Sequence, residues 1–244
     1  ITRHIASLRR AGIRALNADL MYGLPLQTEA DVAEAADYCA EMGVNRISVF
    51  GYAHVPWFAK HQRAIAEADL PGLAERMRQA EVAERIFEKA GYSIIGFDHY
   101  ALPTDSLAIA AADGRLRRNF QGFTDDPGDV LIGLGASSIS KFPQGFAQNA
   151  PGTSKYIAAV RDGQFATARG HTFKGDDRLR ARLIEALMCD FRIDAAEILR
   201  DFDISREALF TMFREANTRF ENILVISDNG LFIPQEARPL TRII

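Results

Sequence analysis

The chain has 244 residues, of which 48% are hydrophobic and 25% charged, values typical of a globular protein that can hold one large α/β domain or a barrel portion with a smaller domain. The net charge of −3 gives no electrostatic case for nucleic acid or an anionic membrane as the main partner. No apolar run approaches the ~20 residues of a membrane-spanning helix, and Cys39 and Cys189 have neither disulfide nor metal-ligand spacing. We therefore expect a cytoplasmic protein.

Both ends of the chain resemble interrupted elements. The first residues read as the second half of a helix, because Ile5 and Leu8 are apolar and Gly12 can end a helix. The apolar stretch 240–244 begins a segment that does not finish. We therefore expect an internal fragment of a longer protein.

The stretch around Asp19 organises the functional interpretation. Residues 18–21 form a short apolar strand interrupted by this carboxylate, Gly23 and Pro25 break the strand, and Thr28 opens a helix with a capping-box pattern. Loops that follow the strands of a parallel sheet often hold ligands, and an acid there can accept hydrogen bonds from a ribose or an amine. From spacing alone, a carboxylate that merely caps the loop is an equally good interpretation.

Strands and helices then alternate as far as residue 150. The first strand–helix–strand unit predicts a right-handed parallel pair, and the whole rhythm indicates part of a (β/α) barrel. Cys39 lies on an apolar helix face, which favours core packing. The strand at 46–52 completes the first unit, and beyond it we expect strands at 92–97 and 130–140, helices at 73–89 and 107–112, and a basic-aromatic loop at 115–123.

After residue 150 the pattern becomes helical. Helices are expected at 153–162, 176–191, 194–200 and 205–216, followed by a hairpin of 223–226 and 231–233 around Asp228-Asn229-Gly230. Three helices and a hairpin describe a winged-helix-like module. Such modules often bind DNA, but the alternation of Arg178, Arg180 and Arg182 with apolar positions fits a solvated helix face better. We expect two domains, 1–150 and 151–244.

The residues themselves predict a small-molecule site at a barrel mouth, but they do not indicate which reaction takes place there. No phosphate-cradling loop or nucleophile elbow is present in the sequence. Asp19, Ala53, His99 and Ile139 each lie at or just past the carboxyl end of an expected strand, as a barrel-mouth site requires. A lone histidine such as His99 is still more often a hydrogen-bonded structural residue than a catalyst.

Motifs at these positions resemble one family. The segments that carry the resemblance, in order and spacing, are Asp19–Pro25, Phe50–Pro56, Gly96–Pro103, Arg118–Phe123 and Gly133–Ser140. Together they are similar to the oxygen-independent coproporphyrinogen III oxidases (dehydrogenases) of bacterial heme biosynthesis, which are radical S-adenosylmethionine enzymes. The resemblance runs from about Arg14 to the end and covers only the later part of that family's length.

The resemblance implies an α/β fold: the later part of an incomplete (β/α) barrel, followed by a mostly helical, winged-helix-like C-terminal domain. It implies a four-iron four-sulfur cluster, two S-adenosylmethionine molecules and a monomeric protein. The implied reaction decarboxylates two propionates of coproporphyrinogen III to vinyl groups and yields protoporphyrinogen IX. The sequence indicates no particular electron donor.

Carried over by motif, the positions that contact S-adenosylmethionine are Asp19, Ala53, Gln121 and Ile139. Three further residues, Arg115, Arg117 and Arg118, are expected to attract the tetracarboxylate substrate through charge-assisted hydrogen bonds. For any one of these arginines a solvated loop end is at least as good an interpretation, and Gln121 could be one hydrogen-bonded amide in an apolar plug.

The chain departs from the family pattern. Arg117 replaces a histidine and Phe123 a tyrosine, and the Cys-x-x-x-Cys-x-x-Cys cluster motif is absent from these residues and is expected upstream. We therefore expect no activity from the fragment alone.

Two other functions remain open. A related heme chaperone shares the fold but carries heme; the segment from Asn119 to Phe123 favours the enzyme. A barrel aldolase or lyase would need a lysine at a strand end, whereas Lys60, Lys141 and Lys155 fall in or beside expected loops.

Overall fold

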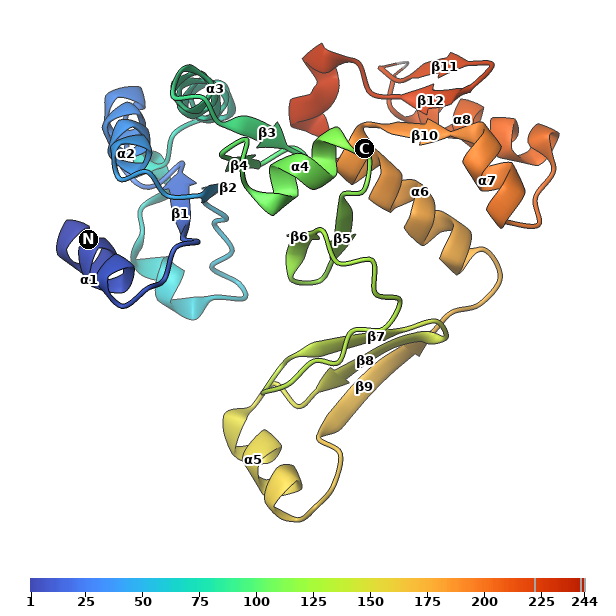
Figure 1. Ribbon diagram of the computed structural model, residues 1–244, viewed down its shortest axis with the longest axis horizontal. Coiled ribbons are helices and arrows are strands. Elements are labelled where there is room, and N and C mark those ends of the chain that lie inside the picture. The colour runs from blue at the N-terminus through green and yellow to red at the C-terminus, as the bar shows by residue number, and fades with distance from the viewer. Residues whose placement is uncertain (222, 242, 244) are drawn as a thin grey trace. The chain divides into compact units, whose positions relative to one another are not determined.

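The computed structural model describes residues 1–221, 223–241 and 243. The chain forms two compact units, Ile1–Gly114 and Arg115–Ile244 (Figure 1). The expected domain boundary at residue 150 marks the end of the barrel portion of the family fold, which is a different criterion from compactness. That boundary stays a prediction. Compactness divides the chain earlier because the segment after Gly114 packs on a helix of the second unit.

The first unit is built on a four-stranded sheet of order β1-β2-β4-β3. Strand β1 pairs with β2 in parallel, as the strand–helix–strand pattern predicts. In chain order the elements are α1 (Thr2–Arg10), β1 (Asn17–Tyr22), α2 (Glu29–Glu41), β2 (Arg46–Gly51), the 3-10 turns η1 (Lys60–Ala64) and η2 (Glu67–Asp69), α3 (Leu73–Lys89), β3 (Ser93–Ile95), β4 (His99–Ala101) and α4 (Ser106–Ala112).

The core of this unit lies between one face of the sheet and helices α2 and α3. Alternate strand residues point to opposite faces, so Leu20 and Ile47 turn toward the helices and are buried with Phe87. The Phe87 ring packs on that of Tyr100 with ring centroids 5.0 Å apart. Helix α2 begins at the expected capping box, with both hydrogen bonds formed. These contacts leave the opposite face of the sheet free for polar residues.

The expected strand at 92–97 is present in shorter form as β3, whereas the strand β4 that follows it was not expected. The chain turns back at Gly96, whose φ is +59°, and β4 inserts antiparallel between β2 and β3. Glycine adopts this backbone region without the steric cost that other residues meet. His99 therefore lies within the sheet and not just past a strand end.

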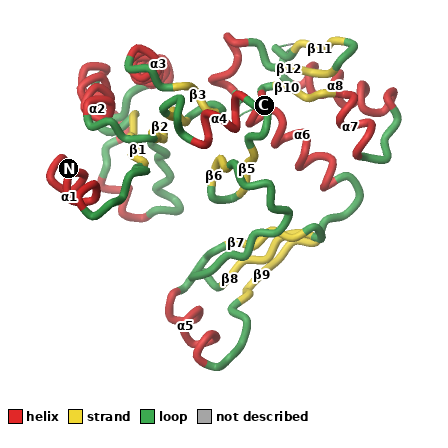
Figure 2. Tube along the Cα trace, viewed as in Figure 1, coloured by secondary structure: helices red, strands yellow, loops and turns green. Residues whose placement is uncertain are grey.

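The second unit holds three small sheets, of order β5-β6, β7-β8-β9 and β10-β12-β11 (Figure 2). Helices α6 to α8 precede the β11–β12 hairpin, so the expected three helices and hairpin are confirmed. The elements are β5 (Arg117–Asn119), β6 (Gly122–Thr124), β7 (Ile139–Phe142), β8 (Gly145–Asn149), α5 (Thr153–Arg161), β9 (Thr167–Thr172), α6 (Asp177–Asp190), β10 (Arg192–Asp194), α7 (Ala195–Asp201), α8 (Arg206–Arg219), β11 (Val225–Ser227), β12 (Gly230–Phe232) and the 3-10 turn η3 (Gln235–Leu240).

Two sequence-based expectations for this unit are wrong. The basic-aromatic segment 115–123 contributes to a hairpin of β5 and β6 and is not a loop. The expected strand 130–140 makes only an isolated bridge from Leu131 before β7 begins. A Cβ on Gly133 would lie 2.8 Å from the carbonyl oxygen of Ile139, so this glycine lets the chain fold back on itself.

Strands β8 and β9 were not expected from the sequence, and β9 has exposed residues throughout. Of the expected apolar ending at 240–244, residues 242 and 244 lie outside the described residues. Among the helices that the structure describes, none combines the length and the apolar character needed to cross a membrane.

Candidate functional site

A polar row crosses the face of the first sheet that points away from α2 and α3. Asp19 on β1 is in register with Ser48 on β2, and Ser48 is in register with His99 on β4. Directly opposed residues point to the same face, so these three side chains form a row over three adjacent strands. The row therefore includes the predicted cofactor residue Asp19 at one end and, two strands away, the half-buried His99.

Hydrogen bonds organise the row from within. Asn17 Nδ2 donates to Asp19 Oδ1 at 2.8 Å, and Ser48 Oγ donates to Asn17 Oδ1 at 3.4 Å. At the other end, His99 Nδ1 lies 2.5 Å from Asp98 Oδ1. Asp19 itself is exposed and, within the described chain, caps no backbone N–H of the following loop. The geometry therefore does not favour the loop-cap interpretation.

A buried glutamine, which the sequence interpretation missed, holds the loop that follows Asp19's strand. Gln79 on α3 has an exposed fraction of 0%. Its Oε1 accepts from the Gly23 N–H at 2.9 Å, and its Nε2 donates to the Gln27 carbonyl oxygen at 2.6 Å. Gln79, Ala83 and Phe87 lie four residues apart on the buried face of α3. One polar residue in an apolar stripe was the signal that could have revealed it.

The loop after β2 carries Ala53. This residue is exposed, and its carbonyl oxygen accepts from Gln62 Nε2 at 3.1 Å. Gln62 Oε1 also accepts from the Val55 N–H at 2.6 Å. Arg76 on α3 donates to the Tyr52 carbonyl oxygen at 2.7 Å. The side chains of α3 thus brace the loops after both parallel strands.

Gln121 and Ile139 belong to the second unit. Gln121 is exposed at the tip of the β5–β6 hairpin, and its N–H donates to Asn119 Oδ1 at 2.7 Å. Next to it, the Phe120 ring packs edge-on against Phe146, with centroids 4.7 Å apart. Ile139 is the first residue of β7, and its backbone lies against the backbone of Gly133.

Of the three predicted substrate arginines, Arg118 alone lines a cavity of about 800 Å³ in the second unit. The backbone N–H of Arg118 donates to Glu185 Oε1 at 3.1 Å. The carbon of its guanidinium group lies 4.6 Å from the centroid of the Phe123 ring. Arg115 is exposed. Arg117 lies near Asp190, whose pKa is raised by burial against the opposing effect of nearby guanidinium groups.

This cavity lies within the second unit and has a volume of about 800 Å³, within the range of about 300–1,000 Å³ that is usual for ligand sites. Its lining combines several phenylalanines with cationic side chains. The lining residues are Arg118, Asn119, Phe120, Asp129, Lys141, Phe142, Pro143, Phe146, Phe173, Arg178, Ala181, Arg182, Ile184, Glu185, Met188 and Phe202.

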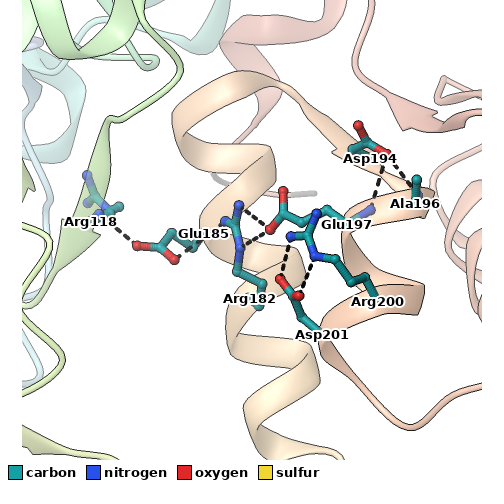
Figure 3. Close-up of polar contacts among 8 residues, drawn as sticks. All are labelled: Arg118, Arg182, Glu185, Asp194, Ala196, Glu197, Arg200 and Asp201. Carbon is teal, nitrogen blue, oxygen red and sulfur yellow. Dashed lines mark hydrogen bonds and ion pairs between the residues drawn. The ribbon is translucent and has the colours of Figure 1, made fainter.

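Arg182 corrects the expectation that its helix face is solvated. Its side chain is only 18% exposed and lies 2.7 Å from Glu197 and 3.5 Å from Glu185 (Figure 3). Both carboxylates come from α6 and α7, the two helices that this arginine joins. Since a half-buried guanidinium needs such partners, Arg182 has a structural role.

The residues of this chain do not fit an iron–sulfur cluster. Among the described residues, no group of three or more His, Cys, Asp or Glu side chains could hold a metal ion. Cys39 and Cys189 belong to different units. Burial raises the pKa of the Cys39 thiol, and it raises that of Cys189 to about 12, so neither forms the thiolate that a cluster needs.

No protein-family model matches the sequence, but individual relatives do. The chain is 48% identical over 242 residues to an oxygen-independent coproporphyrinogen III oxidase of Paracoccus denitrificans, covering 99% of this chain and 54% of that protein. It is 48% identical over 237 residues to the protein of that name from Cereibacter sphaeroides, covering 97% of this chain and 53% of the relative.

The solved structure of coproporphyrinogen III oxidase from Escherichia coli, a radical SAM enzyme, superposes with a TM-score of 0.88 at 33% identity. The match covers 99% of this chain and 56% of that one. The chain therefore has the α/β fold of part of a radical SAM enzyme. More particularly, it is a homologue of the oxygen-independent coproporphyrinogen III oxidases, and it spans about half the length of the curated relatives it matches.

Proposed function

We propose that this chain forms part of an oxygen-independent coproporphyrinogen III oxidase. The observation that carries the proposal is the 48% identity to relatives of that name over 99% of the chain, joined with the fold match. In the proposed reaction, each of two propionates, R–CH2–CH2–COO−, loses a hydrogen atom to a radical, one electron to a one-electron acceptor, and CO2, and becomes a vinyl group, R–CH=CH2. S-adenosylmethionine, bound together with a reduced four-iron four-sulfur cluster that residues outside this chain would hold, would supply the radical that takes the hydrogen atom.

The residues of this chain would bind and orient rather than hold the cluster. Asp19 presents an exposed carboxylate on the polar row, where it can accept hydrogen bonds from ribose hydroxyls or an ammonium group. Gln121 can donate and accept through its amide. Ala53 and Ile139 would add backbone and apolar contacts. Two bound S-adenosylmethionine molecules, a cytoplasmic location and a monomeric state belong to this proposal.

The substrate would meet guanidinium groups of the second unit. Arg115, Arg117 and Arg118 follow one another closely before and within β5, and coproporphyrinogen III carries four carboxylates. Arg118 is the best placed of the three because it lines the large cavity. Removing all three charges should raise the Michaelis constant in a salt-sensitive way, and an unchanged constant would contradict their role.

The test is anaerobic turnover of coproporphyrinogen III by the full-length protein, with protoporphyrin measured after oxidation of the product. The Gln121→Ala variant should lose decarboxylation while its cluster still assembles. Gln164→Ala, which changes an exposed glutamine elsewhere in the second unit, is the matched control. Normal turnover by Gln121→Ala would contradict the role of this residue. Heme binding without turnover by the wild type would favour the chaperone instead.

A further inference from the structure

We infer that the 800 Å³ cavity of the second unit binds the tetrapyrrole substrate and that Lys141 and Arg178 recognise its carboxylates. This inference rests on the proposed function and assigns the substrate a place within it. Neither residue was expected to have this role. Lys141 comes from β7 and Arg178 from the first turn of α6, so two distant segments of the chain present cations to one space.

The walls of the cavity suit pyrrole rings. Phe120, Phe146 and Phe173 form a continuous edge-to-face chain, with centroids 4.7 Å apart for the first pair and 5.0 Å for the second. Each ring is held in place by its neighbour, and such pairs are favourable beyond their buried area. Phe142 and Phe202 extend the apolar lining. A ligand with a large apolar body therefore fits this space.

Two of the four cations that line the cavity, Lys141 and Arg178, are not neutralised by the described part of the protein. Within the described chain, the side chains of Lys141 and Arg178 make no hydrogen bond or ion pair, whereas Arg182 is held by Glu185 and Glu197. The lining contains four cationic side chains against two carboxylates, and one of those carboxylates, Glu185, is already engaged. Cations that border an apolar surface favour an anionic ligand with an apolar body, because they can form charge-assisted hydrogen bonds with its carboxylates.

Charge also separates the two candidate small molecules. S-adenosylmethionine carries a sulfonium and an ammonium against one carboxylate, so its net charge is positive and matches this lining poorly. Coproporphyrinogen III joins four carboxylates to an apolar macrocycle and matches both features. The β5–β6 hairpin places Arg118 and Phe120 in the cavity lining, while Gln121 stays exposed at the hairpin tip. One hairpin would thus link the substrate and the cofactor residue.

The test measures binding of coproporphyrin III, the stable oxidised form with the same four carboxylates, to the full-length protein by fluorescence titration. Lys141→Gln/Arg178→Gln should weaken binding by about tenfold or more and flatten its salt dependence, since one charged hydrogen bond corresponds to about this factor. The control Arg214→Gln/Arg219→Gln removes the same charge from the exposed face of α8 and should bind as the wild type does. Coproporphyrin tetramethyl ester should not distinguish the variants.

Equal affinity of the wild type and the Lys141→Gln/Arg178→Gln variant would overturn the inference, as would a loss confined to S-adenosylmethionine affinity. Because Arg178 is exposed, Arg178→Gln alone provides a variant whose folding is not at risk, and it should weaken coproporphyrin binding by itself. A turnover assay distinguishes failure of the proposed function from failure of the proposed tetrapyrrole site. Coproporphyrin binding that needs the two cations, without decarboxylation by the wild type, would refute the proposed function and leave this site standing.

Discussion

Replacing Gln79 by methionine tests whether α3 sets the position of the loop after β1. Methionine is similar in size and shape to glutamine, so the change removes the amide and leaves the packing nearly filled. Two partners then lose their hydrogen bonds: the Gly23 N–H, 2.9 Å from Oε1, and the Gln27 carbonyl oxygen, 2.6 Å from Nε2. The Gln79 side chain, which forms both hydrogen bonds, has no exposed surface.

The expected cost follows from the burial of the lost partners. A buried polar group left without a partner costs about 1–3 kcal/mol. The Gly23 bond is buried and the Gln27 bond is only part-buried, so we expect a loss of about 1–3 kcal/mol in the free energy of local opening from the first and less from the second, whose carbonyl oxygen water can reach. Amide hydrogen exchange of the segment 19–28 should accelerate accordingly. S-adenosylmethionine affinity should also fall, because this loop follows the strand that carries Asp19.

Gln62→Met is the matched control. Gln62 also accepts from one backbone N–H and donates to one backbone carbonyl, at 2.6 Å and 3.1 Å, but it is only half-buried. Water can replace its bonds, so exchange around this loop should change by less than about tenfold. If Gln79→Met left exchange at Gly23 unchanged, or if both variants behaved alike, the buried amide would not be the anchor of the loop.

The remaining predictions concern one site residue, one carboxyl and one glycine. Asp19→Ala should weaken S-adenosylmethionine binding with little change in Tm; a large fall in Tm with unchanged affinity would refute its binding role. Burial, with help from nearby carboxylates, raises the pKa of Glu84 against the opposing hydrogen bond from Tyr100. Since the folded state then holds this proton to higher pH, ionisation lowers stability as the pH rises through the raised pKa. Glu84→Gln should therefore raise Tm at pH 7 and show no gain below the ordinary glutamate pKa, and an equal gain at both pH values would contradict this. Gly230→Ala would place a Cβ 1.9 Å from a backbone oxygen of β10 and should cost more than about 3 kcal/mol, whereas Gly163→Ala, which meets open space, should cost only about 1–2 kcal/mol; equal losses by thermal unfolding would refute the steric reason.

Local signals in the sequence determined much of the secondary structure. Thr28 and Asp31 predicted the start of α2 because a capping box needs only residues three apart. Helical periodicity predicted α3 with both of its ends, and Asp228 and Asn229 predicted the turn of the last hairpin. The position of Asp19 on a strand followed from the apolar run around it. Each of these features depends on neighbours within a few residues, which the sequence shows directly.

Contacts between distant segments decided the rest. Strand β4 pairs with β2 across about fifty residues, and this pairing, not local propensity, makes a strand of a segment that was expected to be a loop. Gln79 became an anchor only because α3 packs beside the loop of Gly23, 56 residues away in the chain. Lys141 and Arg178 meet one cavity through the arrangement of β7 and α6. Side chains that cooperate over such separations leave no spacing pattern in a single sequence, so only the tertiary structure could bring them together.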